Sequence, residues 1–527
     1  MTSTRTEPIH TRQLAVNPMT RRRPALRIAL ASVAAFGLIA SACGGGTDEG
    51  NGGGDKPTSD EDSSLVNAAD CPVDSLEKAT APVNITVWHA WLGKTRATLE
   101  ATADEFNKSQ SKVHVSVESQ GSYEEMQKKY TDAMATPEAL PDLILSQDTT
   151  LQFMIDSGTA IPAAACIKAD PKSEAIYDDM EPSVISSYSV KDVLWPAAFS
   201  VNAPALYINM AHFKAAGLDT TKLPQTLDEL HAAAKKIADA KAAGVPELQG
   251  VAEPMVLRLD SAWLENWVTG AGVAMVNNDN GRSGLATKSE MDSKEVKDGF
   301  TWLKTMTDEK LLKPVPFSNT FGQLFAMALQ SSSILIDTAT AIPTVDAAIS
   351  GTLKNEDIGA EDLGIDLSTV KVDTLQIGVG AGPGFKEAGK GQIGGAAWYI
   401  VNRDKPESIA AVWEFTKFSN DVAQQVRWTL DGGYLPVRKA ARKDKALETE
   451  LSTTRKGQWL AAVADGITKF DPDKPGPVIG PYNEFRDIYR NALESVTLGG
   501  KGLDETLTDS NTKFNDALAA YQKDVGG

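Results

Sequence analysis

The stretch Val83-Asn-Ile-Thr-Val-Trp-His-Ala-Trp-Leu-Gly-Lys-Thr-Arg-Ala-Thr-Leu-Glu-Ala-Thr-Ala-Asp-Glu-Phe106 decides the fold class, because a strand, a loop and a helix follow one another in it. Ile85-Thr-Val87 alternates apolar and polar side chains and predicts a β-strand. Apolar residues recur at helical spacing over 94–107 and predict an amphipathic helix. The loop between them carries two tryptophans and a histidine, Trp88, His89 and Trp91.

The same order continues along the chain. Strands are predicted at 113–117 and 143–145, and helices at 122–135 and up to residue 156. Strands that alternate with helices form a parallel sheet covered by helices on both faces. Ligands of such sheets lie at the carboxyl ends of the strands. The aromatic loop after the first strand is therefore predicted to face a ligand.

A second unit is predicted to begin near residue 204. Its predicted elements are strands at 204–209, 333–336 and 393–401 and helices at 226–243, 292–309 and from 409 onward. The glycine-rich run Gly378–Gly384 contains Pro383 and is predicted to be a loop.

Length and charge bound the function. A chain of 527 residues is too long for one compact core, so two or more lobes are expected. The formal net charge is −18, and residues 1–42, which hold six arginines and one glutamate, hide part of the acidity of the rest. Such a chain repels nucleic acid and anionic lipid. An anionic ligand would need a local cationic site.

The N-terminus predicts export. Arginines at 21–27, an apolar run at 28–39 and small residues at 40–42 form a signal peptide over 1–42. Cys43 directly after the small residues resembles a bacterial lipobox, which predicts lipidation of Cys43 and a flexible, lipid-anchored tether over 43–82. An ordinary signal peptide with Cys43 as a bystander is the alternative, and the choice between general and twin-arginine export stays open. The predicted location is the extracellular face of the cell membrane.

Two further cysteines, Cys71 and Cys166, would then lie outside the cytoplasm. Cysteines in that compartment pair more often than they stay reduced, so a Cys71–Cys166 disulfide is predicted. Two buried thiols are the alternative.

Motifs of catalysis and metal binding are absent from the sequence, so no catalytic residue, metal or cofactor is predicted. Aromatic side chains at loops and predicted cleft rims instead suggest stacking on sugar rings. These side chains are Trp88, Trp91, Trp263 and Trp267. Because any acidic chain offers carboxylate pairs, a secreted glycan hydrolase remains an alternative. A surface protein with a protein partner is another.

Several short motifs, in order and spacing, resemble the extracellular solute-binding proteins, family 1, of ATP-driven importers. The resemblance covers most of 83–520. The motifs are Ile85-Thr-Val-Trp-His-Ala-Trp91, Gly121-Ser-Tyr-Glu-Glu125, Leu140-Pro-Asp-Leu-Ile144, Leu206-Tyr-Ile-Asn209, Phe213–Asp219, Leu223–Leu230, Ile393-Gly-Gly395 and Gly433-Tyr-Leu-Pro436.

The resemblance implies an α/β fold of two lobes, like that of periplasmic binding proteins, with strands that cross a hinge and a ligand cleft between the lobes. The lobes would close on the ligand, and the closed form would dock on the permease subunits of an ABC importer. The implied protein is a monomer without catalysis, held at the membrane by its lipid anchor only. The implied division is 83–198 and 336–391 in the first lobe, and 199–335 and 392–527 in the second.

The resemblance is nearest to binding proteins for glycerol 3-phosphate and glycerophosphodiesters, and it places ligand contacts by position. With the loop aromatics, the predicted ligand-binding residues are Trp88, His89, Tyr123, Asp148, Asn202, Trp263, Trp267, Thr338, Gly394, Gly395, Tyr434 and Arg486. Tyr123 packing at a helix start, Asp148 capping a helix and Arg486 in a surface ion pair are the structural alternatives. A neutral oligosaccharide is the first ligand hypothesis and a glycerol phosphate the second. Arg486 discriminates, because a phosphate needs a guanidinium fork.

Overall fold

The computed structural model describes residues 66–91, 93–319, 321–354, 372 and 374–526. Within them, one sheet of six strands has the order β2-β1-β3-β13-β4, with β7 paired to β13. Its strands are β1 Val83–His89, β2 Val113–Ser119, β3 Leu143–Gln147, β4 Ala160–Ile161, β7 Ala197–Asn202 and β13 Gly394–Val401. β1 is parallel to β2 and β3, whereas β13 runs antiparallel to β3, β4 and β7.

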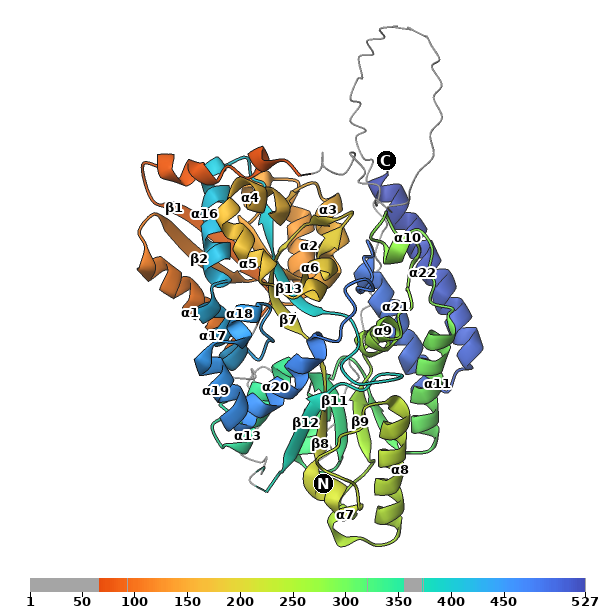
Figure 1. Ribbon diagram of the computed structural model, residues 1–527. Coiled ribbons are helices and arrows are strands. Elements are labelled where there is room, and N and C mark those ends of the chain that lie inside the picture. The colour runs from red at the N-terminus through yellow and green to blue at the C-terminus, as the bar shows by residue number, and fades with distance from the viewer. Residues whose placement is uncertain (1–65, 92, 320, 355–371, 373, 527) are drawn as a thin grey trace, which may run out of the picture. The chain divides into compact units, whose positions relative to one another are not determined.

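A second sheet has five strands within the described residues, in the order β10-β9-β11-β8-β12. Figure 1 shows β8, β9, β11 and β12 running side by side. The strands are β8 Pro204–Asn209, β9 Met255–Arg258, β10 Leu312–Val315, β11 Ile334–Thr338 and β12 Ile377–Ala381. We call the part of the chain built on the first sheet the first lobe and the part built on the second sheet the second lobe.

Helices connect the strands. Before β7 lie α1 Gly93–Ser109, α2 Tyr123–Ala133, η5 Asp148–Thr150, α3 Leu151–Asp156, α4 Ala163–Ala169, α5 Glu174–Asp178, α6 Pro182–Ser187 and the hairpin of β5 Ser189–Val190 and β6 Val193–Leu194. Between β8 and β12 lie α7 Met210–Ala215, α8 Leu227–Ala242, α9 Ser261–Gly270, α10 Asn277–Asn280, α11 Lys294–Asp308, α12 Gly322–Ala328 and α13 Ile342–Ile349. After β13 follow α16 Pro406–Ser419, α17 Val422–Gly432, α18 Lys439–Arg442, α19 Lys445–Thr453, α20 Arg455–Ile467, α21 Tyr482–Thr497 and α22 Leu503–Val525.

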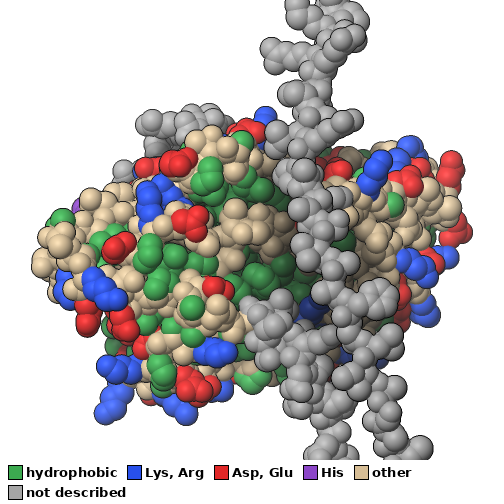
Figure 2. All heavy atoms as spheres, turned by 90° about the horizontal axis from the view of Figure 1, so that it is seen from above, with side chains coloured by type: hydrophobic (Ala, Val, Ile, Leu, Met, Phe, Trp, Pro, Cys, Tyr) green, Lys and Arg blue, Asp and Glu red, His purple; other side chains and the backbone are tan. Residues whose placement is uncertain are grey.

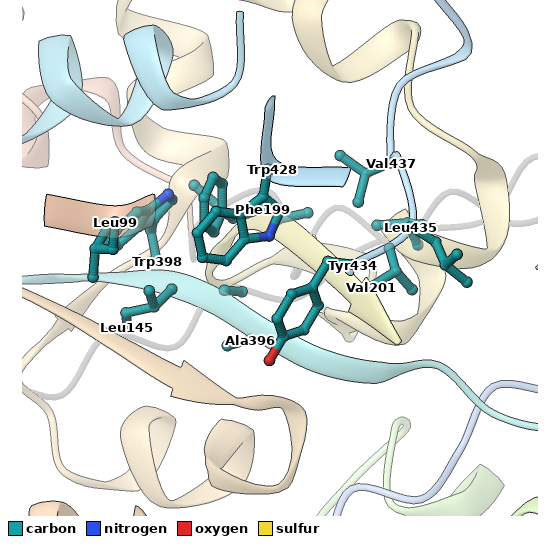
Figure 3. Packing of buried hydrophobic residues seen from close by; sticks show 14 of the residues in the cluster. Leu99, Leu145, Phe199, Val201, Ala396, Trp398, Trp428, Tyr434, Leu435 and Val437 are labelled. Atoms are coloured by element: carbon teal, nitrogen blue, oxygen red, sulfur yellow. The ribbon is translucent and has the colours of Figure 1, made fainter. Parts of the chain in front are cut away.

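The cores follow the alternation of the strands. Along β8, Leu206 and Ile208 face one core, which includes α8, α9, α11, α21 and α22, while Tyr207 faces another. This other core continues into the first sheet, where Trp398 and Phe199 are fully buried. Figure 3 shows the packing of that region. Alternate burial of strand residues is what a sheet covered on both faces requires.

The β-α-β-α-β order predicted from the sequence is confirmed by β1, α1, β2, α2 and β3. The division of the chain after residue 336 differs from the prediction. β12 lies inside 336–391 but pairs with β8 of the second sheet, and β13 lies inside 392–527 but pairs with β3 of the first. The prediction placed β12 in the first lobe and β13 in the second, and the structure shows the opposite for both strands. The error began at Gly378–Gly384, where a loop was expected and a strand is found.

The signal peptide, Cys43 and the tether up to residue 65 lie outside the described residues. From residue 66 to 82 the predicted flexible tether is wrong, because this segment packs on the first lobe. Cys71 and Leu76 are buried in its core, and Lys168 Nζ donates to the Val66 carbonyl at 3.0 Å. In the part of the chain that the structure describes, no helix has the length and apolarity that a membrane span needs.

The predicted disulfide is present, joining Cys71 and Cys166 across 95 residues of sequence. We expect the C71S/C166S double variant to lose about 2–4 kcal/mol of unfolding free energy, because the bond restricts the unfolded chain over a long loop. Urea unfolding at neutral pH measures the loss. The wild type in dithiothreitol should lose as much; equal stability of the variant and the oxidised wild type would show that the bond does not form.

Surface charge matches the composition. Figure 2 shows Lys and Arg side chains interspersed with Asp and Glu over the face in view. A polyanion binds to a continuous cationic patch, and mixed charge of this kind does not form one.

Candidate ligand site between the two sheets

Backbone pairing brings three predicted site residues together. β7 leads into β8 through the single residue Ala203, so the two sheets are joined directly there. Asn202 pairs with Gly394 on β13, and Pro204, two residues later, pairs with Thr338 on β11. The predicted contacts at Asn202, Thr338 and Gly394 therefore lie around one crossing point between the lobes.

Asp148 lies at the carboxyl end of β3, where a ligand of a parallel sheet is expected. Burial, helped by the nearby Glu265 carboxylate, raises the pKa of Asp148 to about 6. The Arg486 guanidinium and the Gly395 amide oppose this shift without cancelling it. The carboxyl group is thus a strong hydrogen-bond acceptor that loses its charge in mildly acidic solution.

Gly395 has a backbone that other residues rarely adopt, with φ of 138°. A Cβ at this position would meet the Ser200 carbonyl oxygen at 2.2 Å. The absence of a side chain lets β13 approach β7 closely and keeps the Gly395 amide near Asp148.

We expect Gly395→Ala to cost about 1–3 kcal/mol of unfolding free energy, because both the backbone conformation and the space oppose a methyl group. Chemical denaturation of G395A beside G217A measures the effect. Gly217 also has a positive φ of 70°, but no atom lies within 4 Å of its Cβ position, so G217A isolates the conformational part. Equal losses in the two variants would contradict a packing role for Gly395.

Aromatic side chains pack together around Tyr434. Trp91 packs on Trp428 and Tyr434, with ring centroids 4.8 and 5.5 Å apart. In Figure 3 the Tyr434 ring joins this apolar cluster while its hydroxyl points away from Trp428. The Tyr123 phenol interacts electrostatically with both Tyr434 and Asp148, and burial raises its pKa well above the usual range. Tyr123 and Tyr434 thus extend the predicted loop aromatics toward Asp148.

Several buried polar atoms in this region have no hydrogen-bond partner within the described residues; they include the Tyr188 hydroxyl, Trp91 Nε1, Trp428 Nε1, His89 Nε2 and Thr149 Oγ1. Tyr188 is 0% exposed and interacts electrostatically with Asp148, Tyr123, Tyr399 and Tyr434. A buried polar group without a partner is costly unless something else satisfies it. The Tyr188 hydroxyl, which interacts with Asp148, can hydrogen-bond a bound ligand, whereas Trp91 lies close to the Tyr123 and Tyr434 hydroxyls.

Arg486 is held by a buried carboxylate. Its Nε and Nη2 donate to the two oxygens of Glu265, both at 3.1 Å, in a two-pronged ion pair. Glu265 is 0% exposed and also accepts hydrogen bonds from Ser261, Gln392 and Tyr482. The structural alternative of a surface ion pair is therefore wrong: Arg486 is in an interior network whose positive charge is offset by Glu265, with Asp148 nearby.

Trp263 and Trp267 do not lie at a cleft rim, and this prediction is wrong. Both are almost fully buried in the second core, where α9 is covered on most sides. Trp263 Nε1 donates to the Arg258 carbonyl at 2.8 Å, and Trp267 packs edge-on against Trp302.

His89 and Trp88 flank the aromatic cluster around Tyr434. The Trp91 amide donates to His89 Nδ1 at 3.1 Å, so His89 fixes the backbone that presents Trp91. Burial, with a contribution from Arg96, lowers the pKa of His89 to about 4, which keeps the ring neutral. Trp88 is half-buried against the cluster of Met126 and Tyr130 beneath α2.

Sequence reasoning did not select Tyr188, Glu265 or Tyr482. Glu265 did have a detectable signal, because it is the acidic residue inside the apolar helix Ser261–Gly270. An acid in such a place needs a buried cationic partner. Tyr188 had no comparable signal.

Comparison with known proteins agrees with this architecture. The family model for bacterial extracellular solute-binding proteins matches residues 101–452. The sn-glycerol-3-phosphate-binding periplasmic protein UgpB of Brucella abortus (strain 2308) is 25% identical over 463 residues, covering 84% of this chain and 95% of that protein.

Two solved structures are similar in fold. The GacH receptor of Streptomyces glaucescens, solved unliganded and with acarbose, has a TM-score of 0.63 and 18% identity, covering 84% of this chain and 99% of its own. UgpB from Mycobacterium tuberculosis, solved with glycerophosphocholine, has a TM-score of 0.62 and 16% identity, covering 84% of this chain and 100% of its own. The predicted two-lobe α/β fold is thereby confirmed. Since the family model matches well over half of the chain, this protein belongs to the family of bacterial extracellular solute-binding proteins.

Proposed function

We propose that this protein is the lipid-anchored, extracellular substrate-binding component of an ABC importer, and that it captures a neutral carbohydrate between its lobes and delivers it to the permease. It acts as a monomer without a cofactor or catalysis of its own. Membership of the solute-binding family supports the transport role. The resemblance of the N-terminus to a lipobox supports the anchor.

The charge balance around Arg486 is the observation that carries the choice of ligand. Glu265 engages two nitrogens of the guanidinium, and Asp148 places a second carboxylate nearby. A phosphate would enter a place where negative charge already offsets the cation, and repulsion would cost much of the binding energy. Neutral hydroxyl groups meet no such repulsion and can donate to Asp148.

The remaining groups suit a saccharide. A carboxylate accepts two hydroxyl hydrogen bonds at once, and each such bond to a charged group is strong. The hydroxyls of Tyr123, Tyr188 and Tyr434 can accept or donate, and the Trp91 indole can donate. Aromatic faces next to polar groups match a sugar ring, which has apolar faces and a polar rim.

A glycerol phosphate or glycerophosphodiester is the second candidate, favoured by the name of the relative that covers 84% of this chain. Binding would require Arg486 to exchange part of its contact with Glu265 for the phosphate. A glycan hydrolase has less support. Glu265, the second carboxylate near Asp148, accepts hydrogen bonds from four side chains and is poorly placed for proton transfer to a substrate.

A thermal-shift panel on the protein from residue 65 onward tests the proposal. The panel holds maltose, trehalose, cellobiose, xylobiose, glycerol 3-phosphate and glycerophosphocholine. A ligand at about 100 times its dissociation constant adds about 2.7 kcal/mol of stability, which is visible as a higher melting temperature. We expect a neutral sugar to give the shift and to be recovered unchanged. A shift with the phosphates alone would reject the proposed ligand class, and steady release of products would reject the proposed function.

A further inference from the structure

An unusual turn carries a buried arginine toward the first lobe. Asn278, Asp279 and Asn280 have φ of 56°, 51° and 57°, and Gly281 follows with φ of 84°. Successive left-handed residues other than glycine strain the backbone, so the surroundings must hold the turn in place. The Asn278 and Asn280 side chains do so from within the second lobe: Asn278 Nδ2 donates to the Leu285 carbonyl and Asn280 Oδ1 accepts from the Met275 amide.

Arg282, the next residue, is 9% exposed and bonds only to backbone carbonyls in the described residues. Nη1 donates to Ser186 and Ser189 at 2.9 and 2.7 Å, and Nη2 to Gly476 and Ser187 at 2.6 and 3.2 Å. Burial lowers the pKa of Arg282 to about 10, so the guanidinium stays charged at neutral pH. A rigid fork of donors is the group that can hold several carbonyls in a fixed arrangement.

These contacts join the two lobes. The gripped segment belongs to the first lobe, because Val190, two residues after Tyr188, is buried together with Ile144 of β3 and Tyr399 of β13. The turn that carries Arg282 belongs to the second lobe, because Val276 is buried in the core that contains Leu206 and Ile208. A backbone bond adds to the junction, since the Lys191 amide donates to the Arg282 carbonyl at 3.0 Å.

Tyr188 lies between the carbonyls that Arg282 holds, those of Ser187 and Ser189. Its hydroxyl has no partner within the described residues and lies in electrostatic range of Asp148, Tyr123 and Tyr434. We propose that Arg282 is a positioning residue: when the lobes close, it takes the carbonyls on both sides of Tyr188 and so fixes the Tyr188 hydroxyl in the ligand site. The inference rests on the proposed function in so far as the site binds a ligand.

As a consequence, the Tyr188 hydroxyl takes its place in the ligand site only when the lobes close. Arg282 never touches the ligand, yet its removal frees Tyr188 to leave the site. A ligand with a hydroxyl at Tyr188 stabilises the closed form, because it binds a group that is in place only there.

Arg282→Met in the full chain, without any ligand, tests the positioning role. Tetranitromethane nitration mapped by mass spectrometry reports whether Tyr188 becomes accessible, and hydrogen exchange reports on the Lys191 amide. We expect both rates to rise on the order of tenfold, the effect of losing hydrogen bonds to a charged group. Tyr177 serves as the internal control, because it is buried with a stacked Trp413 and is not a hydrogen-bond partner of Arg282.

Arg403→Met is the matched control. Arg403 is also largely buried, but it bonds within the first lobe, to Asp142 at 3.0 Å and to the Glu138 carbonyl at 2.8 Å. R403M should leave both rates at Tyr188 and Lys191 unchanged. If Tyr188 and Lys191 stay protected in R282M, or respond equally in R403M, the proposal is wrong.

Two further variants keep the test decisive. If R282M also exposes Tyr177, the same nitration experiment is done on Arg282→Lys. Nitration of Tyr188 while Tyr177 stays protected supports the proposal. Protection of both tyrosines overturns it. For any panel sugar that raises the melting temperature, R282M and Tyr188→Phe should each reduce the shift, and the double variant should add little to Y188F. Full additivity would contradict action through Tyr188. Since the labelling needs no ligand, a silent panel with positive labelling would reject the panel compounds as ligands and leave the positioning of Tyr188 by Arg282 established.

Discussion

Replacing Glu265 by glutamine should destabilise the protein by about 3–5 kcal/mol, the cost of leaving a buried charge without its partner. Glu265 is 0% exposed and Arg486 reaches it with two nitrogens at 3.1 Å. The amide keeps the shape of the side chain but loses the charge, and it cannot accept every hydrogen bond that Ser261 and Tyr482 now donate. Urea unfolding at neutral pH measures the loss.

Glu100→Gln is the control for this prediction. Glu100 forms an ion pair with Arg96 at 2.7 Å, but both side chains are more than 40% exposed. Exposed pairs of this kind contribute little, so E100Q should change stability by less than about 1 kcal/mol. A similar small effect of E265Q would mean that the network around Arg486 does not hold the second lobe together.

E265Q should also lower the pKa of Asp148, because Glu265 is one of the causes that raise it. With the offsetting carboxylate gone, Arg486 gains net attraction for anions. We therefore expect glycerol 3-phosphate to bind E265Q more tightly than it binds the wild type. Unchanged phosphate binding would argue against the charge balance on which the choice of ligand rests.

Asp148→Asn should weaken sugar binding about 100-fold, because the neutral amide replaces a carboxylate that accepts hydroxyl hydrogen bonds. In the wild type, affinity should be constant well above pH 6 and decline as the pH falls through about 6, where Asp148 takes up a proton. D148N should show no such decline. Calorimetric titration between about pH 5 and pH 8 measures both effects.

Asp104→Asn on α1 is the matched control, because Asp104 is exposed and far from β3 in the sequence. It should keep the wild-type affinity and the wild-type pH dependence. If D148N retains the decline near pH 6, the titrating group is another residue and Asp148 does not contact the ligand.

The pH dependence of the unfolding free energy does not isolate the titration of Asp148, because His89 changes stability in the opposite direction over nearly the same pH range. The pKa of Asp148 is raised from 3.8 to about 6, so the folded state loses stability as the pH rises through that window. The pKa of His89 is lowered from 6.5 to about 4, so the folded state loses stability as the pH falls through nearly the same window. The two slopes partly cancel, whereas ligand binding isolates Asp148.

The regular half of the fold could be predicted because its patterns are local. Ile85 and Val87 alternate into the core and Leu99 and Phe106 recur on one face of α1, as the structure has them. The strand β12 could not be predicted, because glycines occupy alternate positions in Ile377–Ala381 and supply no side-chain pattern typical of a strand. A Cβ on Gly380 would lie 2.9 Å from Leu223 Cδ1, so the glycines make room for a segment far away in the sequence.

The site shows the same limit. The positions of Asp148 and Tyr434 in the fold follow from local patterns, because Asp148 comes after a strand and Tyr434 after a glycine pair; their contacts with a ligand stay predictions. The buried ion pair of Arg486 could not be predicted, because its partner Glu265 lies 221 residues earlier in the chain. Tyr188 is placed by Arg282, which no local pattern connects to it. Interactions between the lobes are thus the part of the site that only the folded chain reveals.

Titration calorimetry of the wild type with maltose, trehalose, cellobiose, xylobiose and glycerol 3-phosphate, at low and high salt, decides between a neutral and a phosphorylated ligand. We predict that one of the neutral sugars binds with a stoichiometry of about one and that its affinity changes little with salt, since no ionic contact to the ligand is formed. Tight binding of glycerol 3-phosphate alone, weakened by salt, would show that the ligand is a phosphate and not a neutral sugar.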